Sequence, residues 1–173
     1  MHQQDNDNRH EREPLQPVSM YAIAAKLFAH VAKTVADRFG EEGKQAVMEG
    51  VRAFGLERGQ DIARRAKAIG QDNSLGNYLS NYDMERSDHF EYENVFEEDM
   101  IEQHFTRCIF ADQWEKDGMQ EYGMLYCKMI DPAIAEGFNP QMEVVHDKHF
   151  FTDGCCHFCF RVNKDAPSEA EQK

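Results

Sequence analysis

The sequence predicts an α+β fold, in which N-terminal helices pack on a mostly antiparallel sheet of about four strands with an inserted helix. Two patterns support this prediction. Residues 19–70 carry apolar side chains at helical spacing, whereas the chain after residue 84 alternates apolar and polar side chains as strands do. A further helical segment precedes the last two strand-like segments. Helices followed by strands are typical of the α+β class.

The length and composition predict one folded domain. At 173 residues and 41% hydrophobic composition, the chain can bury one sizeable core but hardly two. Residues 1–17 are polar and charged and hold two of the five prolines, and residues 164–173 are similarly polar. We therefore expect a disordered N-terminal arm at 1–17, a single domain at 18–163 and a disordered tail at 164–173.

Two helices are expected first. Ser19 is a suitable helix cap and Gly40 a suitable helix end, which predicts an amphipathic helix between them. Its apolar positions are Ile23, Leu27, His30 or Val31, and Val35. A second helix is predicted within residues 41–70, although its internal glycines each weaken a helix by roughly 1 kcal/mol relative to alanine. These glycines indicate close helix packing or a backbone that approaches another group.

The remaining elements follow in order. Residues 72–83 predict a short helix or turn, and residues 89–98 and 100–110 predict two strands. Residues 111–138 have helical spacing, with Pro132 expected to end or kink the helix. Residues 142–151 and 155–162 predict the two closing strands. Alternation in the last strand places Cys156, Phe158 and Phe160 on the core face.

Charge and cysteine content exclude several classes of function. A net charge of -13 argues against nucleic acid and anionic membrane surfaces as partners, and no apolar run approaches the roughly 20 residues that span a bilayer. Five unevenly spaced cysteines favour free thiols in a reducing compartment, so we expect a cytoplasmic protein. The expected partner is a small molecule, and a homo-oligomer is left open.

The cysteine-rich end of the chain has features of a metal site. Cys156 and Cys159 have the spacing of zinc ligands, and His146 and His149 would complete a tetrahedral set. On strands, however, residues three apart point to opposite faces, so each pair should diverge. We therefore expect no metal and no cofactor. Cys156 then has two remaining interpretations, as a small core residue or as a thiol at the edge of a pocket.

Four segments, taken in order, resemble a known family. They are a glycine pattern in residues 39–63, Arg107 and Cys108 followed by Trp114, the stretch 122–140 with its Tyr-Cys, Asp and Phe-Asn-Pro, and a closing Cys-x-Phe at 156–158. Together they are similar to the L-2-amino-thiazoline-4-carboxylic acid hydrolase family over most of residues 35–162. The chain departs from the family pattern at Ile109, at the order Asp153-Gly154 and at Cys159.

The resemblance implies a hydrolase that opens a small cyclic amidine-like ring, or a related C–N or C–S bond, by adding water. It points to four catalytic candidates, namely Asp131, Cys156, Cys108 and Cys127. If one helix spans this region, Cys127 and Asp131 are four residues apart and share a face. Asp131 would pair with a cationic amidine and act as general base, or it is only a polar group at a helix end. The cysteines would supply a nucleophile, or they only pack in the core.

Candidates for substrate binding are Asn139, Arg58, Trp114, Tyr126 and His157. An amide or a guanidinium suits a substrate carboxylate, aromatic rings suit a flat ring, and a histidine suits proton transfer. Each also has a structural interpretation, as a turn residue, a surface ion pair, a core aromatic or an exposed histidine. The alternative function is a non-catalytic binding domain, similar to vinyl-reductase-like sensor domains, in which the cysteines only line a cavity.

Overall fold

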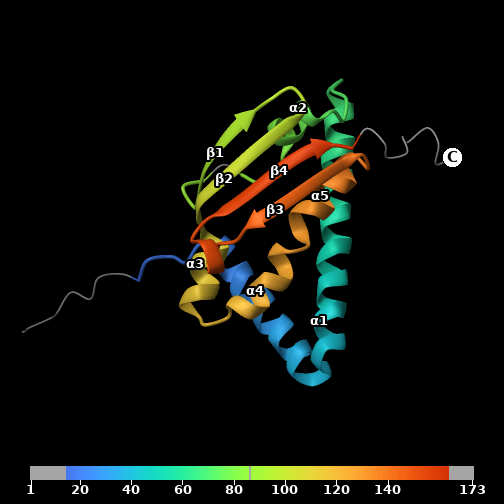
Figure 1. Cartoon of the computed structure of the whole chain (residues 1–173). Coiled ribbons are helices and arrows are strands. Elements are labelled where there is room, and N and C mark those ends of the chain that lie inside the picture. Colours follow the sequence, from blue (N-terminus) through green and yellow to red (C-terminus); the bar gives the residue numbers. More distant parts are fainter. Residues whose placement is uncertain (1–14, 86, 164–173) are drawn as a thin grey trace, which may run out of the picture.

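A computed structural model describes residues 15–85 and 87–163, and it confirms the α+β prediction (Figure 1). The helices are α1 (Met20–Ala68), α2 (Leu75–Tyr78), the 3-10 helix η1 (Leu79–Asn81), α3 (Ile109–Lys116), α4 (Gln120–Cys127), α5 (Ile130–Phe138) and α6 (Phe150–Asp153). The strands are β1 (Phe90–Phe96), β2 (Met100–Cys108), β3 (Met142–Lys148) and β4 (Cys156–Val162). Of the expected terminal arms, residues 1–14 and 164–173 lie outside the described residues.

Helix α1 consists of two helical halves joined at Gly40, as the sequence predicts. Gly40 has φ 62° and ψ -138°, a left-handed conformation that favours glycine, and the chain reverses there (Figure 1). At the start, the Oγ of Ser19 accepts a hydrogen bond from the backbone N–H of Tyr21 at 3.2 Å. This is the predicted cap.

The face that the first half of α1 buries differs from the prediction. Ile23, Leu27 and Val31 are between 45% and 66% exposed. The buried positions are instead alanines, namely Ala22, Ala25, Ala29, Ala32 and Ala36. Helices α3 and α4 approach this side closely, and Trp114 fills the space against Ala25 and Ala29. The face of small residues is therefore the buried one because the large side chain of Trp114 needs that space, although the other face is more hydrophobic.

The second half of α1 packs closely against α5, which explains its glycines. A Cβ atom on Gly55 would lie 2.6 Å from the Cβ of Ala133, and one on Gly59 would collide with the backbone of Ile134. Gly137 of α5 is equally close to the backbone of Leu56. The predicted close helix packing is confirmed at these positions, and it fixes α5 between α1 and the sheet.

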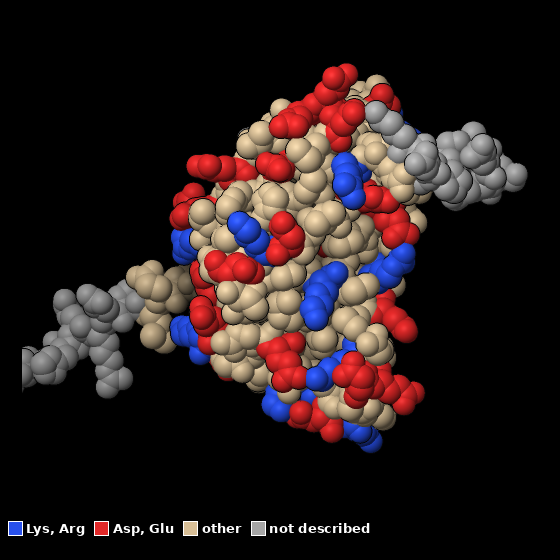
Figure 2. Space-filling model, viewed as in Figure 1, with Lys and Arg blue, Asp and Glu red and all other residues tan. Residues whose placement is uncertain are grey.

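The four strands form one antiparallel sheet in the order β1-β2-β4-β3. The face toward the helices carries Cys156, Phe158 and Phe160 of β4, all buried as predicted. The opposite face is mostly polar, and Val95 and Val145 are also exposed on it. Figure 2 shows acidic and basic side chains interspersed over the side of the molecule seen in Figure 1.

The predicted helix 111–138 is in fact three short helices. The first break follows Lys116, and Gly118 in the connection has a φ of 67°. The second break follows Cys127, where residues 128 and 129 form a turn. Pro132 neither ends nor kinks a helix, because it lies in the first turn of α5, where a backbone N–H has no intrahelical partner. Within the described residues, no helix has both the length and the apolar character that a membrane crossing requires.

Candidate active site

A pocket of about 610 Å³ lies between the helix-facing side of the sheet and the helices, and we call it the main pocket. Residues from β1, β2, β4, η1 and the region where α4 meets α5 line it. A neighbouring side pocket of about 340 Å³ lies beside the first half of α1. The two pockets share Arg58, Met84, Phe110 and Tyr126 as lining residues.

All four catalytic candidates line the main pocket. Cys108 ends β2, Cys127 ends α4, Asp131 is the second residue of α5, and Cys156 begins β4. Four elements that are separate in the sequence therefore bring one carboxyl group and three thiols to the same cavity wall. The expectation that Cys127 and Asp131 share the face of one helix is wrong, because the turn at residues 128–129 separates their helices.

Burial keeps the three pocket thiols protonated at neutral pH. It raises the pKa of Cys108 to about 11 and that of Cys156 to about 12. For Cys127, burial and then the neighbouring Cys108 and Cys156 raise the pKa well above its ordinary value. At Cys108, hydrogen bonds from the backbone N–H groups of Phe110 and Ala111 favour the thiolate, but burial outweighs them. The thiolate, which is the nucleophilic form of cysteine, is therefore scarcely populated at pH 7.

Asp131 has a pKa that its surroundings bring close to the neutral range. Burial raises its pKa from 3.8 to about 6, and the positive charge of Arg58 opposes that shift. Its place in the first turn of α5 also favours the negative form, since helix N-termini carry partial positive charge. A carboxylate with a pKa near 6 is charged at pH 7 and remains basic enough to accept a proton.

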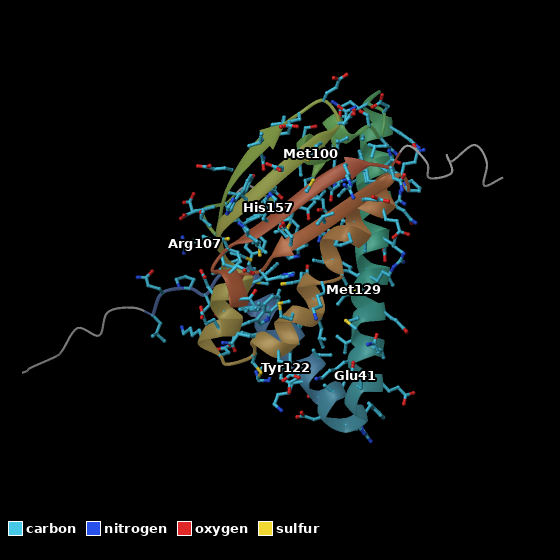
Figure 3. The ribbon with its side chains drawn as sticks, in the orientation of Figure 1. Glu41, Met100, Arg107, Tyr122, Met129 and His157 are labelled. Atoms are coloured by element: carbon cyan, nitrogen blue, oxygen red, sulfur yellow. The ribbon has the colours of Figure 1, made fainter. Side chains whose placement is uncertain are left out.

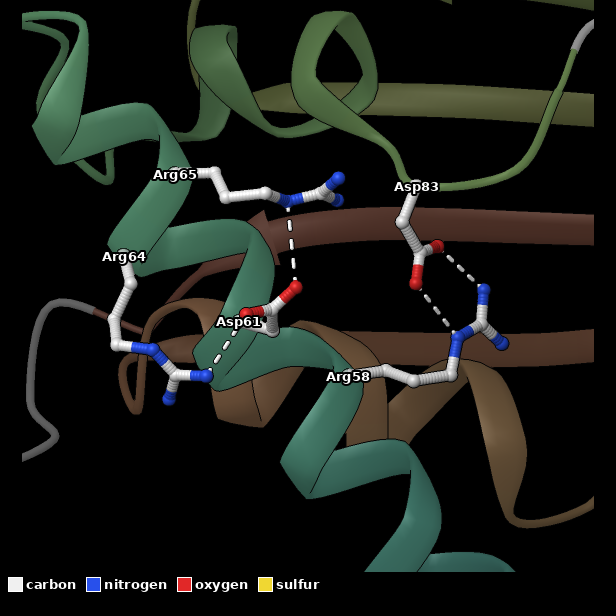
Figure 4. A network of polar contacts seen from close by, with 5 residues as sticks. All are labelled: Arg58, Asp61, Arg64, Arg65 and Asp83. Atoms are coloured by element: carbon white, nitrogen blue, oxygen red, sulfur yellow. Dashed lines mark hydrogen bonds and ion pairs between the residues drawn. The ribbon is translucent and has the colours of Figure 1, made fainter.

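Arg58 is held by a partner from its own chain. Its Nε and Nη2 atoms donate to the two carboxylate oxygens of Asp83 at 2.9 and 2.6 Å, and the two side chains are only 14% and 19% exposed (Figure 4). Burial alone would lower the pKa of Arg58. The hydrogen bonds and charge of Asp83, together with the interactions with Tyr82 and Tyr126, outweigh burial and raise the pKa. The bidentate position expected for a substrate carboxylate is thus filled by Asp83.

The remaining predicted binding residues are dispersed. Tyr126 lines both pockets, whereas Trp114 lines only the side pocket, is 1% exposed and donates through Nε1 to the carbonyl of Ala25 at 2.8 Å. Asn139 lines neither pocket. It is the C-cap of α5, where its side-chain amide donates to the carbonyl of Asn73 and accepts from the N–H of Gln141, both at 2.9 Å.

His157 points to the outer face of the sheet, where its Nδ1 lies 2.7 Å from Asp147 and its Nε2 lies 4.0 Å from Glu102. Figure 3 labels it on β4, together with Arg107 near the end of β2. The histidine in the main pocket is His146, stacked on Phe158 with ring centroids 4.0 Å apart. Burial, and then His149, lowers the pKa of His146 to about 4.

The expected divergence of His146 and His149 is wrong. Their ring centroids lie 3.8 Å apart, because the pairing of β3 with β4 shifts between His146 and Lys148 and the strand ends there. Cys156 and Cys159 do face opposite sides, with Cys156 buried and Cys159 on the outer face. Among residues 15–85 and 87–163, no three His, Cys, Asp or Glu side chains are grouped so as to hold a metal ion.

Sequence reasoning missed two amides in the main pocket, Asn94 and Gln103. They are paired across β1 and β2, and Gln103 is 9% exposed while the Oδ1 of Asn94 is buried without a hydrogen-bond partner. A signal was present in the alternation of β2, which places Gln103 between Ile101 and Phe105 on the core face. A polar side chain in that position calls for a partner.

Comparison with known proteins identifies a family match. The family described as L-2-amino-thiazoline-4-carboxylic acid hydrolase matches residues 20–160, which include every element from α1 to β4 apart from the last two residues of β4. No curated protein and no solved structure matches the chain significantly. The matched range contains the carboxyl group and the three thiols of the main pocket.

Proposed function

Because the chain belongs to the L-2-amino-thiazoline-4-carboxylic acid hydrolase family, we propose that it opens a cyclic amidine-like ring by adding water, with Asp131 as the general base. The observation that carries this proposal is the buried carboxyl group of Asp131, with a pKa of about 6, in a pocket that three protonated thiols also line. An amidine-type ring is a cation near neutral pH. A buried carboxylate is the complementary group, and the ring would place its electrophilic carbon beside that carboxylate.

The reaction balances with one water and one base. Water oxygen forms a bond to the ring carbon that lies between the two heteroatoms, and Asp131 takes a proton from that water. The resulting tetrahedral centre collapses to a C=O as the bond to a ring heteroatom breaks, and Asp131 returns the proton to the departing heteroatom. The hydroxyl proton of the tetrahedral centre is released to solvent, which balances the proton that the cationic ring brought in. The product is an open chain that is heavier by one water, a carbamoyl-cysteine when the ring is a 2-aminothiazoline-4-carboxylate.

The thiols support the carboxylate rather than replace it. A cysteine nucleophile must first become a thiolate, and the raised pKa values of Cys108 and Cys156 oppose that step. As neutral S–H groups, the thiols are weak donors that can face a carboxylate or a developing anion. We therefore favour water activated by Asp131 over covalent catalysis.

The setting of the reaction follows from the same residues. The substrate is a small molecule that enters the main pocket. All five cysteines are free thiols, which suits a reducing compartment, and we place the enzyme in the cytoplasm.

The proposal is tested by incubating the purified protein with 2-amino-2-thiazoline-4-carboxylate and related cyclic amidines and following ring opening by mass. We expect a product heavier by one water. Asp131→Asn should lower kcat by about 10² to 10⁴ while leaving the far-UV circular dichroism spectrum unchanged. Asp147→Asn, which removes an exposed carboxylate on the outer face of the sheet, is the matched control and should retain activity.

Two results would speak against the proposal. Equal turnover by Asp131→Asn and wild type would remove Asp131 from the mechanism. No turnover of any cyclic amidine by the folded protein would favour the alternative, a binding domain that uses the same pocket without chemistry.

A further inference from the structure

The main pocket is much larger than the compound in the family's name. Its volume of about 610 Å³ is within the range of roughly 300–1,000 Å³ that takes drug-sized ligands. A 2-aminothiazoline-4-carboxylate is one small ring with an amino and a carboxyl group. A substrate that fills this cavity must extend well beyond the ring.

The helix-facing side of the sheet shows where such an extension would lie. Strand pairing arranges its residues in three successive rows. The first row is Tyr92, Phe105 and Cys156, the second is Asn94, Gln103, Phe158 and His146, and the third is Phe96, Ile101, Phe160 and Val144. Adjacent rows are about 7 Å apart, so the wall continues about 14 Å from the row of Cys156.

This wall is rich in aromatic residues, and its third row is apolar throughout. Phe96, Phe158 and Phe160 all line the main pocket. Phe158 and Phe160 are 6% and 2% exposed, and their rings stack with centroids 6.1 Å apart. Rings of this kind bind apolar and especially aromatic groups through offset or edge contacts.

The charges of the main pocket do not suit a free carboxylate. Of the described residues that line it, Arg58 is the one Lys or Arg, and its two-pronged contact is occupied by Asp83. Glu85 and Asp131 add negative charge to the same lining. A substrate carboxylate would have to displace Asp83 or remain without a counter-charge, which is costly in a partly buried site.

The paired amides offer an uncharged alternative in the second row. Asn94 and Gln103 are cross-strand neighbours, and both line the main pocket. Gln103 is a diagonal neighbour of Cys156, a separation of about 7–8 Å. Side-chain amides both donate and accept hydrogen bonds, so together they match the N–H and C=O of an amide.

From these observations we propose, building on the proposed function, that the substrate is an amidine-type ring whose carboxyl position is an uncharged amide bearing an apolar, ring-containing substituent. The ring cation lies against Asp131, the amide lies against Asn94 and Gln103, and the substituent lies along the Phe96, Phe158 and Phe160 wall.

The test compares 2-amino-2-thiazoline-4-carboxylate with its N-benzyl amide. We would measure kcat/KM for both when they are turned over and the dissociation constant by calorimetry when they are not. Burial of the benzyl group should make the amide preferred by about tenfold or more. Gln103→Leu and Asn94→Leu should each reduce this preference by about three- to tenfold, because each removes one hydrogen bond. His104→Leu, next to Gln103 but exposed on the outer face, should keep it.

The outcomes separate this inference from the proposed function. A carboxylate that is bound or turned over as well as the benzyl amide would overturn the inference, as would an unchanged preference in both leucine variants. Tight binding of the benzyl amide without turnover of either compound would support the inferred ligand class and defeat the hydrolase proposal. Failure of both compounds to bind would overturn the inference, and the hydrolase proposal would then depend on the other cyclic amidines.

Discussion

Cys127 and Asp131 belong to different helices, the last residue of α4 and the second residue of α5, yet both line one pocket. The turn at residues 128–129 makes this possible by starting a new helix just before the carboxylate. Asp131 thereby gains the favourable field of a helix N-terminus, which opposes the effect of burial, and its resulting pKa is about 6. The catalytic account depends on this balance.

The first prediction concerns stability. Because burial raises the pKa of Asp131 above 3.8, the folded protein binds its proton more tightly than the unfolded chain does. Folding stability should therefore fall as pH rises from about 4 to about 6, and the penalty should persist above 6. Asp131→Asn removes it, so the variant should be more stable than wild type by about 1–3 kcal/mol at pH 8 and lose this advantage at pH 4.

Urea unfolding of both proteins at the two pH values measures this difference. A variant that is less stable than wild type at pH 8 would show that Asp131 has stabilising partners in the fold and is not held at a cost for function.

The second prediction separates the two roles of the thiols. With water activated by Asp131, Cys108→Ala and Cys156→Ala should each lower kcat by less than about tenfold, since neither thiol bonds to substrate. Cys159→Ala, on the other face of β4, is the control for both. The measurement is kcat for each variant, obtained from steady-state kinetics in which the product is quantified. A loss of about 10³ or more in one pocket variant alone would identify that cysteine as a covalent nucleophile.

The third prediction concerns the glycines that let α1 and α5 approach. Gly59→Ala should destabilise the protein by about 1–3 kcal/mol, because its Cβ would collide with the backbone of α5. Gly50→Ala is the matched change in the same helix. A Cβ there meets nothing within 4 Å, so the free energy of unfolding should rise by roughly 0.5–1 kcal/mol. Equal effects of the two substitutions on thermal unfolding would contradict the close packing described.

Much of the fold could be predicted from local patterns. Alternation along residues 155–162 gave the correct buried face of β4, and Ser19 and Gly40 gave the limits of the first helical half. The apolar stripe at Ile23, Leu27 and Val31 gave the correct helix but the wrong face. The spacing of apolar residues predicts that a helix forms. Which face of the helix is buried depends on the size of the side chains that pack against it. Here Trp114 requires the alanine face.

The site was harder to predict because it depends on contacts between distant segments. The resemblance to the family pointed to Asp131 and the three cysteines, and the fold places all four in one pocket. The partner of Arg58 could not be foreseen, since Asp83 is 25 residues away in a connecting segment. The sequence also could not show that His146, and not His157, lines the main pocket. That depends on where β3 ends and on which face of the sheet the helices cover.

The most direct test of the central claim is the pH dependence of kcat/KM for ring opening. If Asp131 is the base, kcat/KM should rise as pH increases through about 6 and then level, and this limb should be missing in Asp131→Asn. A wild-type profile that rises only in the alkaline range, toward the pKa of about 11 of Cys108, would contradict the account and point to a thiolate.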